Sequence, residues 1–243
     1  MKSLQIYSNN FLKYATAPDG VTWPEGVEKL FNNNRLDPFT YPGTSLTLDF
    51  LVKDASGLAA SRSADCIIIK NSNIAAVNLQ WYTLDGVIKP GAAFTVNGQD
   101  IMYFLPETLT SGRFVLNITA MPGSAALSIG TLQCCRFIVE PCAQTETDIA
   151  AARGADSYRT YGGQVVHFSA YRKKDFSVSI KNCPKQDYDL IYAAIAQTEE
   201  LIVAFWEDYE PLDVYEAYID PEISKEVNRR TGLINFKMKG QEL

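Results

Sequence analysis

The chain has 243 residues, of which 47% are hydrophobic and 21% are charged, and this ordinary globular composition excludes a mostly disordered protein. The length accommodates one large β domain or two compact domains. The formal net charge of −6 leaves no excess of cations for binding a phosphate backbone, so we expect no specific nucleic-acid binding.

The start of the chain reads as a first strand, with Leu4 and Ile6 alternating with polar residues. Residues 1–10 lack the apolar core of a secretory signal, so we expect no signal peptide. The sequence also contains no run of about eighteen apolar residues, and we therefore expect no membrane span.

Most of the first 140 residues read as short strands separated by turn signals such as Asp85-Gly86 and Asn97-Gly98. Residues 44–50 alternate polar and apolar, and residues 66–69 form a continuous apolar run that suits a strand buried on both faces. This spacing predicts a β-sandwich, a jelly roll, over residues 1–140. The strands are expected at residues 46–52, 65–70, 76–83, 93–96, 101–105, 113–120 and 128–139, with one helical turn at 26–31.

Residues 141–163 have a different composition, first polar and then rich in small residues. We interpret this segment as a linker between two domains. An arm that packs on a neighbouring copy is the alternative.

Residues 164–243 predict an α+β domain. Residues 165–171 and 176–181 read as a hairpin joined by a basic turn at 172–175. The clearest helix follows at 184–197, where Leu190, Ile191, Ala194 and Ile195 recur at helical spacing and Asp187 lies in the first turn. Three further strands, at 201–206, 214–219 and 233–239, complete an antiparallel sheet under this helix.

The chain carries no catalytic or cofactor motif that we recognise. The five cysteines have no CxxC spacing, and His167 is the single histidine, so neither zinc nor another cofactor is expected. No nucleophile elbow accompanies His167, which we interpret as a packed or rim residue of a strand.

An acidic stretch between Asp187 and Glu222 contains no Lys or Arg. It is interpreted as a solvated face, as a set of oxygen ligands for calcium, as paired carboxylates for glycoside hydrolysis, or as an electronegative surface that repels anions. The residues that carry these alternatives are Glu207, Asp208, Glu210 and Asp213.

Aromatic residues are plentiful, and those of the first domain are candidates for a platform that stacks on sugar rings. The candidates are Trp23, Trp81 and Tyr82. Such residues are more often part of a hydrophobic core or an interface, and the sequence leaves both interpretations open.

Two architectural patterns resemble phage tail proteins. The buried strand at 67–69 followed by the Asn-rich turn at 70–73, with the closing strands 113–118 and 127–132, resembles their discoidin-like, galactose-binding-type jelly rolls. Residues 161–163, the segment 172–179 and the helix at 188–197 are similar to the tail-tube-like domain of distal tail and tail-tip proteins. In common distal tail proteins, however, the tube-like domain precedes the other domain.

The resemblance implies a non-enzymatic component of a phage tail tip or baseplate, found in the virion after synthesis in the bacterial cytoplasm. Its partners would be further copies in a ring around the tail channel, other tail proteins and a host glycan. The acidic stretch would then line the channel, where negative charge lets DNA slide. A carbohydrate-binding or receptor-binding module is the alternative function, and a glycan-active enzyme is the second alternative.

Overall fold

The computed structural model describes residues 3–31, 37–159, 165–198, 200–207, 210–220 and 223–243. The chain divides into two compact units. One is the sandwich unit, Tyr7–Phe137, and the other is the helix unit, which combines Met1–Ile6 with Ile138–Leu243.

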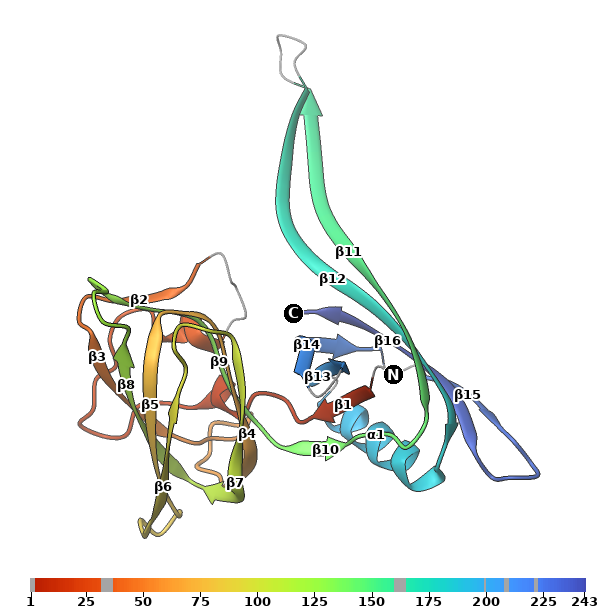
Figure 1. The fold of residues 1–243 in the computed structure, drawn as a ribbon, viewed down its shortest axis with the longest axis horizontal. Helices are drawn as coiled ribbons and strands as arrows, with labels where there is room; N and C mark the ends of the chain where they lie inside the picture. The colour runs from red at the N-terminus through yellow and green to blue at the C-terminus, as the bar shows by residue number, and fades with distance from the viewer. Residues whose placement is uncertain (1–2, 32–36, 160–164, 199, 208–209, 221–222) are drawn as a thin grey trace. The chain divides into compact units, whose positions relative to one another are not determined.

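The sandwich unit consists of two four-stranded antiparallel sheets, one ordered β2-β9-β4-β7 and the other β3-β8-β5-β6 (Figure 1). Two 3-10 helices, η1 (Phe11–Tyr14) and η2 (Val27–Phe31), precede the strands. The strands are β2 (Phe39–Tyr41), β3 (Ser45–Leu51), β4 (Arg62–Ser72), β5 (Ile74–Tyr82), β6 (Ile88–Thr95), β7 (Ile101–Ser111), β8 (Arg113–Ala120) and β9 (Leu127–Cys135).

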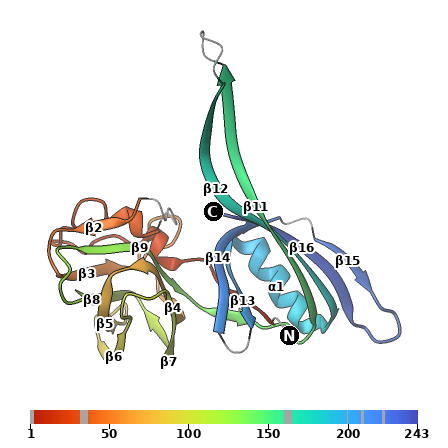
Figure 2. The same cartoon turned by 45° about the horizontal axis from the view of Figure 1, so that its top comes forward.

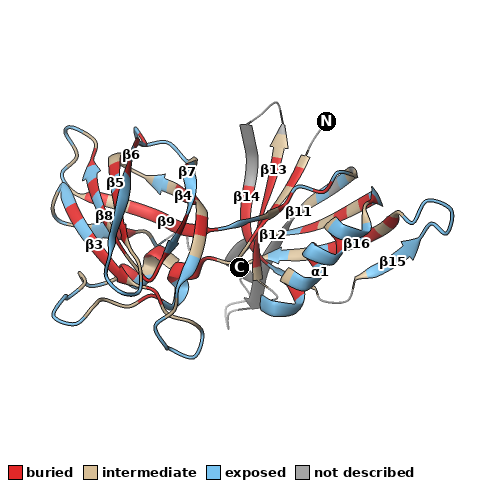
Figure 3. Ribbon diagram, turned by 90° about the horizontal axis from the view of Figure 1, so that it is seen from below, coloured by how far each residue is buried: buried red, intermediate tan, exposed pale blue. Residues whose placement is uncertain are grey.

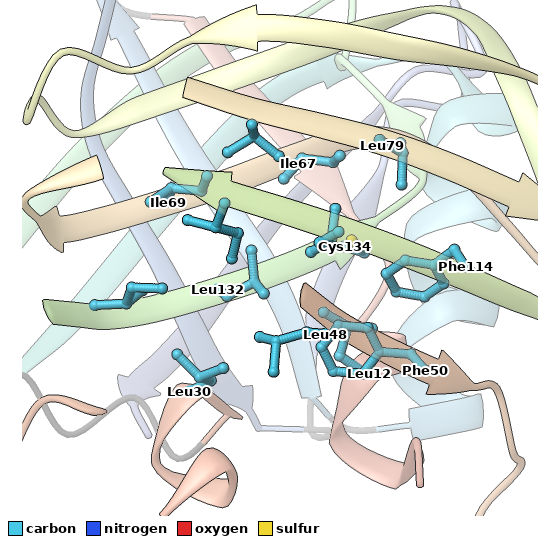
Figure 4. Close-up of a cluster of buried hydrophobic side chains, with 14 of the residues drawn as sticks. Leu12, Leu30, Leu48, Phe50, Ile67, Ile69, Leu79, Phe114, Leu132 and Cys134 are labelled. Atoms are coloured by element: carbon cyan, nitrogen blue, oxygen red, sulfur yellow. The ribbon is translucent and has the colours of Figure 1, made fainter. Parts of the chain in front are cut away.

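A single hydrophobic cluster fills the space between the two sheets of this unit (Figure 4). Phe50 of β3 and Phe114 of β8 stack with ring centroids 5.0 Å apart, and Leu132 of β9 and Ile67 of β4 come from the other sheet. Leu12 and Leu30 of the two 3-10 helices join the same cluster. Buried residues alternate with more exposed ones along β8 and along the first four residues of β3, as a half-buried strand requires, and this explains why these strands were predictable.

The helix unit is an eight-stranded sheet with one α-helix against it, as Figure 2 shows. The strand order is β10-β1-β13-β14-β16-β12-β11, with β15 paired to β16. The elements are β1 (Ser3–Tyr7), β10 (Phe137–Val139), β11 (Gln144–Arg159), β12 (Val165–Cys183), α1 (Lys185–Thr198), β13 (Glu200–Glu207), β14 (Glu210–Ile219), β15 (Ser224–Val227) and β16 (Ile234–Glu242).

Helix α1 buries Tyr188, Ile191 and Ile195 against the sheet. The Tyr188 ring meets Phe236 of β16 edge-on at 5.1 Å between centroids. Strand β13 contributes residues that are buried along most of its length, as the red segments of Figure 3 show. The expected mainly β fold, with a β-sandwich and one helix on an antiparallel sheet, is therefore confirmed.

Three details differ from the sequence-based expectations. Residues 144–159 form β11 rather than a linker, and residues 172–175 lie inside the continuous strand β12 rather than in a turn. The N-terminal strand β1 belongs to the sheet of the helix unit rather than to a sandwich over 1–140. The helix unit thus begins before the sandwich unit, which is inserted between the neighbouring strands β1 and β10.

Candidate functional site

The acidic residues singled out in the sequence fall on the β13–β14 hairpin. Glu207 is the backbone partner of Glu210, and Asp213 is the partner of Phe205. Asp208 and the side chains of the other three residues lie outside the part of the chain that the structure describes. The interpretation of these residues as a channel-facing surface, and the calcium and glycosidase alternatives, therefore stay predictions.

The three aromatic candidates do not share one exposed platform. Trp81 is only 4% exposed and belongs to the sandwich core, because β5 turns it toward the other sheet. Trp23 is half-buried: its indole N–H donates a 2.7 Å hydrogen bond to the carbonyl of Asp49, and its ring packs against Phe50 at 5.3 Å. The burial of Trp81 makes its ring unavailable for stacking on a ligand.

Tyr82 is the one aromatic candidate that lies beside charged groups. The Arg113 guanidinium sits over the Tyr82 ring, 5.1 Å from its centroid. Arg113 also donates two hydrogen bonds to Asp49, from Nε to Oδ1 at 2.9 Å and from Nη2 to Oδ2 at 2.6 Å. These bonds to Asp49 raise the pKa of Arg113, and the fork geometry holds the guanidinium in one orientation. Tyr82 and Arg113 are partly exposed, whereas Asp49 is buried beneath the guanidinium and holds it in place. We call these three residues the Tyr82 cluster.

The most distinctive feature of the helix unit is the length of β11 and β12. These strands pair with each other from Gln144–Lys181 to Arg159–Val165, whereas β16 pairs with β12 only from Asp175 to Cys183. Within the described residues, the outer part of the hairpin therefore has no third strand, and it extends beyond the sheet as a ribbon (Figure 1). We call residues 152–173 the hairpin arm.

A groove of about 440 Å³ lies on the helix unit where the hairpin arm begins. We call it the base groove. The register places its residues in adjacent rows, because Asp175 is the partner of Gln241, which is in turn the partner of Tyr218. The side chains that line it are Asp148, Asp175, Ser177, Tyr218, Asp220, Lys239 and Gln241.

The polar groups of the base groove are partly ordered by bonds among themselves. Gln241 Nε2 donates a 3.0 Å hydrogen bond to Asp175 Oδ1. Gly240 precedes Gln241 on β16. A Cβ at Gly240 would come within 2.3 Å of the Phe176 ring, so the close packing of β16 on Phe176 requires a glycine. Tyr218 is 41% exposed and supplies an apolar surface beside the carboxylates.

A second groove, of about 420 Å³, lies farther along the same sheet between β12, β16 and β15. Its lining includes Lys181, Lys225 and Lys237, with Glu226 as the acidic member. Lys181 Nζ forms a 2.6 Å ion pair with Glu146, and Lys225 Nζ lies 4.8 Å from the centroid of the Tyr188 ring. This sheet therefore carries a carboxylate-rich groove near the arm and a lysine-rich groove away from it.

Among the described residues, no three His, Cys, Asp or Glu side chains gather as a set of metal ligands. The described part of the chain also has no helix that is both long and apolar enough to span a membrane.

Sequence reasoning missed both the hairpin arm as a paired ribbon and the base groove. The groove combines residues from four strands, and no local pattern in the sequence shows which strands become neighbours. One sequence feature that could have drawn attention to the arm is its positive charge. Four cations fall in a short part of an otherwise acidic chain: Arg153, Arg159, Arg172 and Lys173.

Comparison with solved structures finds a likeness for part of the chain. No family model matches the chain, and no curated protein matches it. The solved structure of a family 32 carbohydrate-binding module from Streptococcus pneumoniae EndoD covers 52% of this chain and 99% of its own length, with 15% sequence identity and a TM-score of 0.42. A likeness of this size is no basis for assigning function, and the tail-protein part of the resemblance stays a prediction.

Proposed function

We propose that this chain is a structural protein that assembles with further copies of itself through the hairpin arm, as a component of a phage tail tip or baseplate. The observation that carries the proposal is the two-stranded ribbon formed by β11 and β12 beyond the sheet. A two-stranded hairpin is at best marginally stable alone in water, so an arm of this length is expected to gain its stability from a partner. In the described part of the arm, the outer edges of both strands have no further strand beside them, and such edges are suited to that contact.

The insertion of the sandwich unit supports the same function. The helix unit is completed by β1 and by the strands after residue 137, so it can form an assembly while the sandwich unit serves as an attached module. A contact in which an arm on one copy binds a different surface on the next is heterologous, and such contacts close into rings when the rotation permits. We infer that the protein acts in the virion tail without catalysis.

Shortening the arm tests this proposal. Ala151 is the backbone partner of Lys174, so an Asn-Gly turn between these residues can replace residues 152–173 with a two-residue hairpin loop. None of the described core residues lies in the replaced segment, so we expect the sheet and helix to remain folded. In light scattering, we expect the full chain to form oligomers and the shortened chain to be monomeric. If both proteins are folded and form assemblies with the same number of subunits, the proposal is contradicted.

Carbohydrate binding by the sandwich unit is a second candidate function, favoured by the Tyr82 cluster. It combines a half-buried aromatic ring with a partly exposed guanidinium that the buried Asp49 carboxylate holds in place, and sites for small ligands combine apolar surface with a few placed polar groups. The ligand under this proposal is a host glycan.

A thermal-shift screen against bacterial surface polysaccharides tests glycan binding. A ligand at about 100 times its dissociation constant stabilises the folded state by about 2.7 kcal/mol, which shifts the melting temperature measurably. We expect Tyr82→Ala to abolish the shift. The matched control is Tyr14→Ala, at an exposed tyrosine of the same unit, and it should retain the shift. A shift that survives Tyr82→Ala would remove the Tyr82 cluster as the site.

A further inference from the structure

The charge of the hairpin arm is opposite to that of the whole chain. Residues 152–173 contain four cations, Arg153, Arg159, Arg172 and Lys173, against the single anion Asp156, for a net charge of +3, whereas the full chain has −6. The strand register makes Arg153 the direct partner of Arg172, and Lys173 follows on the same strand. Like charges directly opposite each other destabilise a strand pair, so the ribbon is stabilised when carboxylates of a partner approach it.

The base groove carries the complementary charge. Its lining contains the carboxylates Asp148, Asp175 and Asp220 against one ammonium, that of Lys239. The ring of Tyr218 and the amide of Gln241 lie beside them, which gives the groove both an apolar contact surface and a hydrogen-bonding group. A groove of this composition suits a basic, extended backbone segment.

The arm of the same chain is not placed to fill this groove. Asp148 and Asp175 belong to β11 and β12 themselves, and the arm continues from them as extended strands. A strand advances about 3.3 Å per residue, so the Arg153 backbone lies about 17 Å beyond Asp148. The backbone of the arm thus runs away from the carboxylates at its base, and a second molecule is suited to bring the basic segment and the groove together.

We propose that the base groove of one copy binds the hairpin arm of a second copy, with the groove carboxylates against Arg153 and Arg172. This inference rests on the proposed self-assembly and identifies the surface that receives the arm. Each copy then offers one arm and one groove, which is the heterologous arrangement that generates a ring. Because the contact is electrostatic and close to the surface, assembly weakens as the salt concentration rises.

Charge reversal on each side, followed by its combination, tests this contact. The arm variant is Arg153→Glu with Arg172→Glu, and the groove variant is Asp148→Lys with Asp175→Lys. We expect each to raise the dissociation constant for self-association at least ten-fold in sedimentation velocity. A mixture of the two variants should associate again, because the acidic arm of the arm variant can bind the basic groove of the groove variant, and the unchanged basic arm of the groove variant can bind the unchanged acidic groove of the arm variant. The protein carrying all four changes should likewise recover most of the wild-type affinity.

Matched controls place the same charge changes at other exposed positions. Asp19→Lys lies in the sandwich unit and Arg229→Glu follows β15, and both residues are exposed. These controls should assemble like the wild type, and circular dichroism should show every variant folded.

The outcomes separate this inference from the proposed function. If the shortened chain is monomeric while the arm and groove variants assemble normally, the arm acts at another surface and the inference is wrong. Failure of the four-change protein to recover affinity, with its parts folded, also overturns the pairing. If the shortened chain assembles as well as the full chain, the proposed function itself fails.

Discussion

The cysteines differ sharply in their surroundings although the sequence gives them no pattern. Cys142 is exposed, whereas Cys66, Cys134, Cys135 and Cys183 are buried. Desolvation raises the pKa of the Cys134 and Cys135 thiols well above the ordinary value and raises the pKa of Cys183 to about 11. The thiolate is the reactive form, so burial suppresses the reactivity of these groups through both access and ionisation.

We therefore expect one fast-reacting thiol when the folded protein is treated with an aromatic disulfide reagent at pH 8. Cys142→Ser should abolish this fast phase, and Cys183→Ser should leave it intact. The remaining thiols should react only after denaturant is added. A fast phase that persists in Cys142→Ser would show that one of the other four sites opens in the native state.

Helix α1 offers a test of packing with neighbouring residues. Ile191 is fully buried against the sheet, while Leu190 is 43% exposed. Removing the buried side chain in Ile191→Ala loses transfer free energy and leaves a cavity, so it should lower the free energy of unfolding by about 2–5 kcal/mol. Leu190→Ala should change it by no more than about 0.5 kcal/mol, as is usual for surface positions. Urea unfolding of the two variants measures the difference, and equal losses would place Leu190 in a contact.

The helix and most strands could be predicted because each buries one face, which imposes a period on the sequence. Residues 113–120 were expected as a strand and form β8, since β8 alternates buried and exposed positions. The outer parts of β11 and β12 extend past the sheet, so no core imposes alternation there, and the basic residues 172–175 were misinterpreted as a turn. The base groove was unpredictable for a related reason: it depends on the order of strands distant in sequence.

At the scale of the molecule, the sequence correctly suggested two compact parts but not how the chain passes between them. A short strand such as β1 carries no mark of the sheet it joins, and Leu4 and Ile6 would suit either unit. They pack in the core of the helix unit, with Val203 of β13 and Val139 after the sandwich unit. The helix unit therefore cannot be produced from residues 141–243 alone without losing β1.

The sandwich unit, in contrast, should fold by itself as residues 7–137. Its ends adjoin, because the amide of Ser8 donates a 2.8 Å hydrogen bond to the carbonyl of Arg136, and its core draws on strands from this segment alone. Adjacent termini are what allow a domain to be inserted into another. We expect the fragment to unfold cooperatively, and Phe50→Ala to lower its free energy of unfolding by about 3–5 kcal/mol. In the full chain, the same substitution should shift only the unfolding transition of the sandwich unit. The unfolding transition of the helix unit should not change. It can be followed by Trp206 fluorescence in a protein with Trp23 and Trp81 replaced by Phe. A shift of both transitions would show that the two units unfold as one.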